Sequence, residues 1–381
     1  MLIEGRPRLE SPVVTEEKVR EALRNVLDPE IGKPIEDIGM LKGIEVDGGN
    51  VRVFVLLTIA GCPLKDRINS DVTAAVSPIE GVESVEVILG EMSGDQREGL
   101  VQQLRGGRPE ETAFFTDGDT EVISVASGKG GVGKSSVTAN LAVALAAEGH
   151  QVGVVDADVW GFSIPRMMGV SGRPVAFNNM IMPLESHGVK VISMGFFVSD
   201  ETPVIWRGPM LHKAVQQFLG DVYWGDLDFL LVDLPPGTGD VSLSLASFLP
   251  GSSMLVVTTP QDAARKVAER AGRMAQHPNV RMKILGVIEN MAGFACPHCG
   301  EITDVFGRGG GEETAKALDA DFLGSVPMQV SLREGSDAGT PIVVRDPDSP
   351  AGSAFRDIAT QIARKTKTRV GKSLPLSVAP R

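Results

Sequence analysis

The run GKGGVGKSS at residues 128–136 constrains this chain more than any other feature. It fits the pattern G-x-x-x-x-G-K-[ST], in which glycines let the backbone curl around phosphate oxygens and present N–H groups to them. Lys134 is the lysine that the pattern requires, and the run carries a second lysine, Lys129, five positions earlier. The pattern predicts a phosphate-binding loop.

The sequence on both sides of the loop supports this interpretation. Residues 121–126 form a short apolar, β-branched run, and residues 137–148 have the apolar spacing of a helix, closed by Gly149. The loop is therefore expected between a strand and a helix, whose N-terminus favours an anion. The residues expected to contact a nucleotide are Gly128, Lys129, Gly130, Gly131, Val132, Gly133, Lys134, Ser135 and Ser136.

Acidic residues follow two further predicted strands. Asp156 and Asp158 come after the strand at 151–155, and Asp233 follows the strand at 228–232. Ligands of parallel α/β sheets bind at this edge. We expect Asp233 and Asp156, with the Ser135 hydroxyl, to hold Mg²⁺, Lys134 to contact the β- and γ-phosphates, and Asp158 to orient the attacking water. The alternative is that these carboxylates only cap a helix or a turn.

Composition excludes several classes of protein. A chain of 381 residues with 42% hydrophobic residues and a formal charge of -12 is typical of an acidic globular protein. This charge disfavours nucleic acid as a partner. The N-terminus lacks the apolar core of a signal peptide, and no run approaches about eighteen apolar residues, so neither a membrane anchor nor secretion is expected. We expect a cytoplasmic protein.

The pattern of apolar residues predicts an α/β protein with two domains. Residues 1–94 are expected to form a small α+β domain, with helices at 16–27 and 64–76 and strands at 51–59 and 82–89. Residues 95–120 are polar and lack periodicity, which is typical of a linker.

Strands and helices alternate through residues 121–363. This alternation predicts a mostly parallel sheet covered by helices on both faces. The strands are expected at 121–126, 151–155, 189–193, 228–232, 253–258 and 284–288. Residues 364–381 hold six Lys or Arg and no acid, and are expected to form a flexible basic tail.

Two of the three cysteines are spaced C-x-x-C, at Cys296 and Cys299. Two thiolates are half of a four-ligand metal site. His298 lies in the same tight loop and cannot easily complete it, whereas a two-fold dimer brings four cysteines together. Four thiolates suit either Zn²⁺ or a 4Fe-4S cluster, and the spacing alone does not distinguish them. A dithiol redox pair is a third alternative.

The remaining cysteine, Cys62, ends the apolar strand and precedes Pro63. Proline favours the first position of a helix, so the sulfur is expected at a helix N-terminus, which stabilises a thiolate. The alternative is a buried structural cysteine.

Taken together, these motifs resemble the Mrp-type iron-sulfur cluster carrier ATPases, within the MinD/ParA and nitrogenase-iron-protein class. The resemblance covers about residues 15–360. The small domain looks like iron-sulfur assembly factors through DPEIG and TIAGCP. The large domain departs from the usual pattern at Trp160 and Phe162, where Tyr and Pro are more usual. The motifs are GKGGVGKSS, DADVWGFSIP, WRGPM, DLPPGTGD, ENM and CPHCG.

The resemblance implies a homodimer that hydrolyses MgATP and carries a labile 4Fe-4S cluster from donors to apo-proteins. In such proteins a lysine at the place of Lys129 reaches the partner subunit's nucleotide, and Asn290 would contact adenine. Cys62 would handle iron or cluster in transit, beside Asp28 and Glu30. Two alternatives are a MinD/ParA-like positioning ATPase without a cluster, and a zinc-bridged scaffold dimer.

Overall fold

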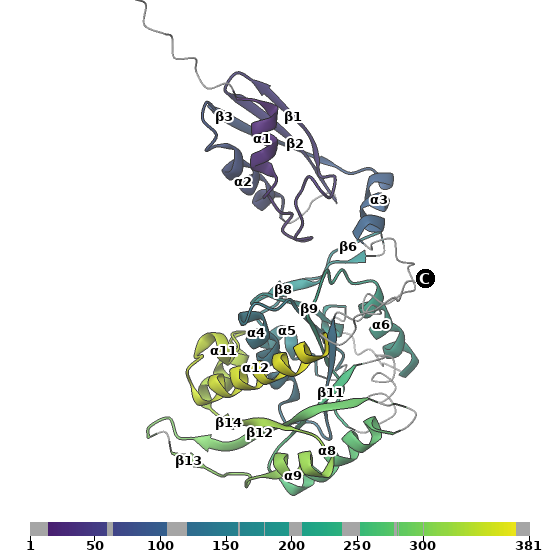
Figure 1. The fold of residues 1–381 in the computed structure, drawn as a ribbon, viewed down its shortest axis with the longest axis vertical. Coiled ribbons are helices and arrows are strands. Elements are labelled where there is room, and N and C mark those ends of the chain that lie inside the picture. Colours follow the sequence, from purple (N-terminus) through teal and green to yellow (C-terminus); the bar gives the residue numbers. More distant parts are fainter. Residues whose placement is uncertain are drawn as a thin grey trace, which may run out of the picture. The chain divides into compact units, whose positions relative to one another are not determined.

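A computed structural model describes residues 14–58, 64–104, 120–158, 161–178, 180–197, 208–237, 252–277, 280, 282–299 and 301–370. The chain divides into two compact units (Figure 1). One comprises Met1–Glu110 together with Val175–Met182, and the other comprises Glu111–Pro174 together with Pro183–Arg381. Each unit is described by itself.

The smaller unit packs helices against a three-stranded sheet. The strands lie in the order β1-β2-β3, with β1 antiparallel and β3 parallel to β2. The Thr15 side chain caps α1 by accepting a hydrogen bond from the Lys18 amide. The elements are α1 (Glu16–Leu23), β1 (Leu41–Asp47), β2 (Asn50–Leu57), α2 (Lys65–Val76), β3 (Ser84–Glu91) and α3 (Gly94–Leu104), with the short pair β6 (Ala176–Phe177) and β7 (Met180–Ile181).

Three details of this unit differ from the sequence expectation. Helix α1 ends at Leu23 rather than at residue 27, since Leu27 pairs with Pro34 in a turn that the Asp28 carboxylate closes. Strand β1 was not expected. The linker prediction is wrong for residues 95–104, because α3 occupies them and buries Leu100, Val101 and Leu104.

The larger unit is built on a nine-stranded sheet, in the order β13-β12-β11-β4-β10-β5-β9-β8, with β14 beside β12. Every pairing is parallel except those of β8 and β13. The six strands expected from the sequence are all present, and β8, β13 and β14 are additional. The strands are β4 (Glu121–Ser127), β5 (Val152–Asp156), β8 (Leu184–Ser186), β9 (Val189–Ser193), β10 (Phe229–Asp233), β11 (Ser253–Thr258), β12 (Lys283–Ala295), β13 (Ile302–Thr303) and β14 (Phe322–Met328).

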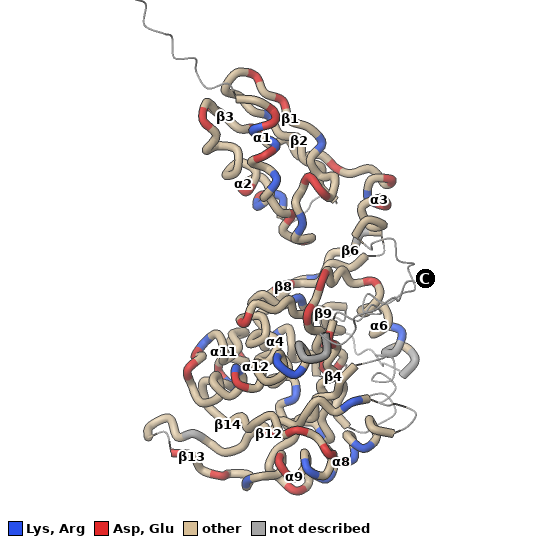
Figure 2. The backbone as a smooth tube through the Cα atoms, viewed as in Figure 1, with Lys and Arg blue, Asp and Glu red and all other residues tan. Residues whose placement is uncertain are grey.

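Helices flank this sheet, as the alternation of strands and helices predicts. α4 packs with α12, and α8 packs with α9 on the opposite face (Figure 1). Figure 2 shows basic residues on α8 beside acidic ones on α9, where Arg265 Nε lies 3.3 Å from Glu313 Oε2. The elements are α4 (Lys134–Ala147), α5 (Ile164–Met167), η1 (Met194–Phe196), α6 (Gly208–Gly220), α8 (Asp262–Ala275), α9 (Gly310–Ala317), α10 (Val330–Asp337), α11 (Ile342–Arg345) and α12 (Pro350–Val370).

The central strands are buried on both faces. Every residue of β5, β10 and β11 is buried, and α4 is buried from Val137 to Leu145. Near-continuous apolar runs are what parallel strands covered by helices require. The rigid centre of the unit is therefore β4, β5 and β10 with α4, and the polar residues at their ends are held by a packed core.

The C-terminal part of the chain is more ordered than expected. Helix α12 continues to Val370, so the prediction of a flexible tail is wrong for residues 364–370. Lys365 Nζ lies 2.5 Å from Asp321 Oδ2, and Thr366 is buried. Among the helices that the structure describes, none combines the length and the apolar character needed to cross a bilayer.

Candidate nucleotide and cysteine sites

The phosphate-loop pattern lies between β4 and α4, as expected. Gly131 and Gly133 both have φ of +79°, a conformation that side chains disfavour, and Gly133 caps α4. Gly128 packs on α8: a Cβ there would lie 2.4 Å from the backbone of Val267 and Ala268. The glycines are therefore required by backbone conformation at two positions and by close packing at a third.

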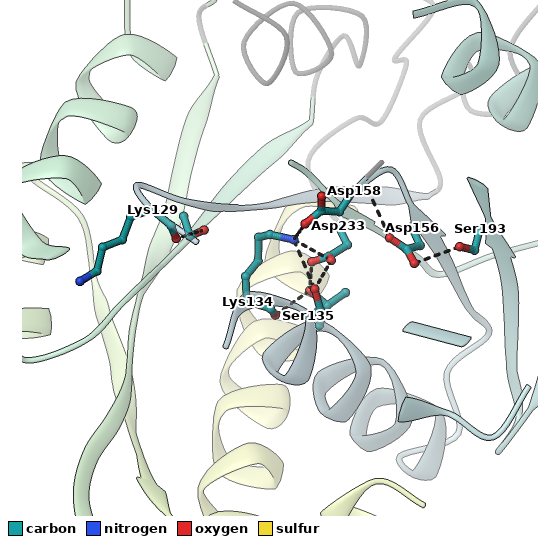
Figure 3. Close-up of polar contacts among 9 residues, drawn as sticks. Lys129, Lys134, Ser135, Asp156, Asp158, Ser193 and Asp233 are labelled. Carbon is teal, nitrogen blue, oxygen red and sulfur yellow. Dashed lines mark hydrogen bonds and ion pairs between the residues drawn. The ribbon is translucent and has the colours of Figure 1, made fainter. Parts of the chain in front are cut away.

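A buried ion pair stands at the start of α4. Lys134 Nζ lies 2.6 Å from Asp233 Oδ2, and the Ser135 hydroxyl donates to the same oxygen at 2.6 Å (Figure 3). Asp233 is inaccessible to solvent, and the Lys134 side chain is only 5% exposed. The sheet brings these groups together because β10 is the direct neighbour of β4. Ser135 and Asp233, predicted as magnesium ligands, are thus in hydrogen-bond contact.

The other two predicted carboxylates lie beside this pair at the end of β5. The Ser193 hydroxyl donates to Asp156 Oδ2 at 3.0 Å, and the Asp158 amide donates to Asp156 Oδ1 at 3.3 Å (Figure 3). Asp158 Oδ2 lies 3.7 Å from Lys134 Nζ. Carboxylates that end β10 and follow β5 therefore meet at Lys134, as expected from their positions at the carboxyl edge of the sheet, and Ser193 of β9 joins the group through Asp156.

Electrostatics within this cluster favour a cation. Burial, and then the charge of Asp233, raise the pKa of Asp156 to about 8. Neutral pH therefore leaves a proton on Asp156, because one lysine does not balance the buried carboxylates. Hydroxyl and carboxylate oxygens are the ligands that Mg²⁺ prefers, so Ser135, Asp156 and Asp233 have the chemistry of a magnesium site.

Lys129 does not join this cluster. Its ammonium group lies 3.2 Å from Gln261 Oε1, just before α8, and its side chain points away from Lys134 (Figure 3). The side chains of the two loop lysines therefore point in different directions: Lys134 contacts the carboxylates of its own chain, and Lys129 does not.

Asn290 lies against the loop itself. On β12 its amide Nδ2 donates to the Val132 carbonyl at 2.9 Å, and a Cβ at Gly133 would lie 2.2 Å from that nitrogen. Asn290 is buried. The residue expected to contact adenine is therefore adjacent to the phosphate loop and is held there by a backbone contact.

Sequence reasoning missed three polar side chains of this region. Thr138 donates to Asp233 Oδ1 at 2.7 Å, Ser193 bonds Asp156, and Gln261 bonds Lys129. Thr138 follows Lys134 by four residues on α4, a spacing that places both on one face, so periodicity could have indicated it. Ser193 and Gln261 are brought in by tertiary structure, and no local pattern marks them.

Cys296 and Cys299 lie in the hairpin between β12 and β13. The Cys296 amide donates to the Glu301 carbonyl at 2.9 Å, which closes the turn. Both cysteines are free thiols, Cys296 half-buried and Cys299 exposed. Backbone N–H groups of His298 and then Cys299, followed by the Cys299 side chain, lower the pKa of Cys296. This environment favours a thiolate, the form that binds metal.

Other predicted residues are less informative. Cys62 and Trp160 lie outside the described residues, and Phe162 packs on Gly195, where a Cβ would lie 2.8 Å away. Burial raises the pKa of Asp28 and of Glu30, the latter also through the charge of Asp28. Within the described part of the chain, no group of three or more His, Cys, Asp or Glu has the arrangement of a metal site.

Two family models match this chain, one in each of its two parts. The family model described as NUBPL iron-transfer P-loop NTPase matches residues 119–363, and the one described as iron-sulfur cluster assembly protein matches residues 16–87. The iron-sulfur cluster carrier protein of Mycobacterium leprae (strain TN) is 50% identical over 372 residues, which cover 95% of this chain and 96% of that protein.

Two further relatives extend this likeness. The iron-sulfur cluster transfer protein NUBPL of Mus musculus is 43% identical over 284 residues, 74% of this chain and 88% of that protein. A nucleotide-binding protein from Archaeoglobus fulgidus, solved in complex with ADP, is 39% identical with a TM-score of 0.51, covering 57% of this chain and 86% of that one. Because this family model matches more than half of the chain, the chain belongs to the NUBPL iron-transfer P-loop NTPases.

Proposed function

We propose that this protein is a cytoplasmic homodimer that binds and hydrolyses MgATP and carries a 4Fe-4S cluster to apo-proteins. The observation that carries the proposal is the presence, in one unit, of a phosphate loop with its carboxylates and of a free cysteine pair with a lowered Cys296 pKa. The names of its relatives, an iron-sulfur cluster carrier and an iron-sulfur cluster transfer protein, support the cargo.

The loop and its neighbours would act on the nucleotide. Loop amides and Lys134 bind the phosphates and offset charge on the transferring phosphoryl group. Ser135, Asp156 and Asp233 hold Mg²⁺, which when bound neutralises charge on the phosphate oxygens. Asp158, placed 3.7 Å from Lys134 Nζ, orients the attacking water. Asn290 contacts adenine.

Binding requires an exchange of partners. Lys134 and Ser135 both contact Asp233 Oδ2. For Lys134 to bind a phosphate and for Ser135 to help hold Mg²⁺, both side chains must leave that oxygen, which would then be available as one of the groups that hold the ion. The ion pair with Lys134 thus compensates the buried charge of Asp233 when no magnesium does, since an unpaired buried carboxylate is costly.

Lys129 would act across the dimer. Its side chain points away from the carboxylate cluster of its own chain, and the Gln261 amide oxygen holds it there. This direction supports a contact with the partner subunit's nucleotide, which would add positive charge only in the closed dimer. Hydrolysis would then loosen the dimer and gate release of the cluster.

The cysteine pairs of two subunits would hold the cargo. Adjacent residues of one tight turn cannot surround a cluster, and a two-fold axis supplies two pairs from identical surfaces. The exposed Cys299 and half-buried Cys296 suit a site shared at a surface and accessible to a recipient. The cluster is substrate here: it arrives from a donor protein and leaves to an apo-protein.

We retain a small domain, predicted at 1–94, and a P-loop domain at 121–363. The flanking segments, predicted at 95–120 and 364–381, are corrected by α3 and by the end of α12, which are helical to Leu104 and Val370. We assign iron or cluster handling to the small domain, through Cys62 with Asp28 and Glu30. No nucleic acid or membrane partner is included.

Metal analysis after anaerobic reconstitution tests the cargo. We expect about four iron and four acid-labile sulfide per dimer in the wild type, and loss of both in Cys296→Ala and in Cys299→Ala. Cys62→Ala is the matched control, and it should retain the cluster. Stoichiometric zinc without sulfide would favour the scaffold alternative, and no metal at all would favour a positioning ATPase.

A second experiment addresses Lys129. Lys129→Ala should leave nucleotide binding intact and lower hydrolysis about a hundredfold or more, as expected for a cation supplied in trans. Full activity in this variant would remove Lys129 from the mechanism.

A further inference from the structure

We propose that Thr138 is a positioning residue that fixes the orientation of Asp233 for magnesium, both before and after the nucleotide binds. The inference rests on the proposed hydrolysis of MgATP and concerns a side chain with no contact to nucleotide in that proposal. It is carried by the arrangement of hydrogen bonds around the two oxygens of Asp233.

The hydroxyl of Thr138 is directed at the carboxylate. Thr138 is fully buried on α4, and its Oγ1 lies 2.7 Å from Asp233 Oδ1 and 3.1 Å from the Lys134 carbonyl oxygen. A hydroxyl has one proton to donate. The shorter contact leads to the charged acceptor, and hydrogen bonds to a carboxylate are stronger than those to a carbonyl, so the proton lies toward Asp233.

The two oxygens of Asp233 have different partners. Oδ2 accepts from Lys134 at 2.6 Å and from Ser135 at 2.6 Å, whereas Oδ1 accepts from Thr138. Lys134 and Ser135 must leave Oδ2 in the proposed cycle. Thr138 has no such task, so it is the donor that can hold the carboxylate while the other two exchange.

The backbone on both sides of this contact belongs to buried, packed elements. Asp233 ends β10, which is buried throughout and pairs with both β4 and β5. Thr138 lies in the buried part of α4. A hydrogen bond between two packed elements restricts rotation of the carboxylate plane, and thereby keeps Oδ2 toward Ser135 and the loop.

Loss of the hydroxyl should therefore act on magnesium and spare the phosphate contacts. With Oδ1 unpaired, the carboxylate is free to rotate and its buried oxygen loses a donor. The loop amides and Lys134 are unchanged. Nucleotide affinity without magnesium should stay the same, and the gain in affinity that magnesium brings should shrink.

Thr138→Val and Thr138→Ser form a matched pair, because valine keeps the shape without the hydroxyl and serine keeps the hydroxyl. The measurement is the equilibrium affinity of full-length protein for a fluorescent ATP analogue, in Mg²⁺ and in EDTA. We expect the ratio of the two affinities to fall about tenfold in Thr138→Val and to change less than about threefold in Thr138→Ser. The magnesium concentration that gives half-maximal hydrolysis should rise in parallel.

The outcomes separate this inference from the proposed function. If Thr138→Val leaves the ratio of the affinities in Mg²⁺ and in EDTA unchanged, whether or not both affinities fall, the positioning role is overturned. Wild-type hydrolysis is unaffected by that result. A wild type that neither hydrolyses ATP nor binds it better with Mg²⁺ would overturn the proposed function itself. If Thr138→Val does not fold, Thr138→Ala tests the same loss of the hydroxyl without the extra methyl group in a buried site.

Discussion

The phosphate loop and the cysteine hairpin differ in how completely one chain satisfies them. Around Lys134, polar side chains pair with Lys134 or with one another at 2.6–3.7 Å, and all of them are buried except the half-buried Ser135: Ser135, Thr138, Asp158 and Asp233. At the hairpin, Cys299 is exposed, and the thiol of Cys296 depends on the N–H groups of its own turn. The loop belongs to a packed core, and the hairpin is local structure at a surface.

This difference indicates which site needs a second molecule. A buried cluster must compensate its charges within the chain, since unpaired charge in a core is costly. An exposed turn with two thiols carries no such requirement and can leave its ligands incomplete until a partner supplies the rest. Substitutions at the loop should therefore change both stability and nucleotide chemistry, and substitutions at the hairpin should change cargo alone.

The largest effect is expected from removing the buried cation. Lys134→Met should lower hydrolysis at least a hundredfold and reduce the free energy of unfolding by about 3 kcal/mol, because Asp233 is left buried without its counter-charge. Hydrolysis assays and chemical denaturation measure the two effects.

The double variant Lys134→Met/Asp233→Asn separates the loss of hydrolysis from the loss of stability. It removes both charges, so most of the lost stability should return while hydrolysis stays absent. Cys299→Ala is the hairpin control and should change the unfolding free energy by less than about 0.5 kcal/mol. An equal loss of stability at Cys299 would contradict the contrast between the two regions.

The loop glycines provide a second, smaller test. Gly131 and Gly133 share a φ of +79°, but only Gly133 lacks room, since a Cβ there would lie 2.2 Å from Asn290 Nδ2. Gly131→Ala should therefore cost about 1 kcal/mol of strain, and Gly133→Ala more, with a greater loss of nucleotide affinity. Calorimetry and nucleotide titration measure both quantities.

Adding Asn290→Ala to Gly133→Ala should recover part of the stability, because the alanine no longer meets the amide. If Gly131→Ala and Gly133→Ala prove equally damaging, backbone conformation alone governs the loop and the packing of Asn290 is unimportant.

Sequence patterns predicted the loop better than its surroundings for a physical reason. Glycine positions, strand ends and carboxylates are local features, so Lys134, Asp156 and Asp233 were found together from the sequence and lie together in the structure. Thr138 and Ser193 have no motif, because a hydroxyl that bonds a distant carboxylate looks like any other until the strands are assembled. Helix α3 was missed because its polar composition masked a weak apolar face, and the end of α12 was missed because residues 364–370 are mostly basic or polar.

The third prediction concerns proton binding at the loop. With its pKa raised to about 8, folded Asp156 keeps a proton that the unfolded chain releases near pH 4. Between these values the folded state binds more protons, so the free energy of unfolding falls as the pH rises. Asp156→Asn cannot titrate there. In EDTA, the melting temperature of Asp156→Asn minus that of the wild type should increase from pH 5 to pH 8. If this difference stays constant, Asp156 is already ionised in the folded protein.

The smallest effect is expected at the hairpin, where the thiol is tuned by a few exposed hydrogen bonds. In the variant Cys62→Ser/Cys299→Ser, the alkylation rate of Cys296 with iodoacetamide should rise with pH around a midpoint below that of a free cysteine, about 8.5. The direction follows from the lowered pKa, since N–H groups donating to the sulfur favour the thiolate and let it form at lower pH.

Unfolding is the matched control for this thiol, because the hydrogen bonds exist only while the turn is folded. In concentrated urea the midpoint of the same variant should move up to that of a free cysteine. Identical midpoints in native and unfolded protein would mean that the turn does not prepare the thiolate. The hairpin would then contribute only the spacing of its two sulfurs. Binding of the cargo would depend even more on the cysteines of the partner subunit.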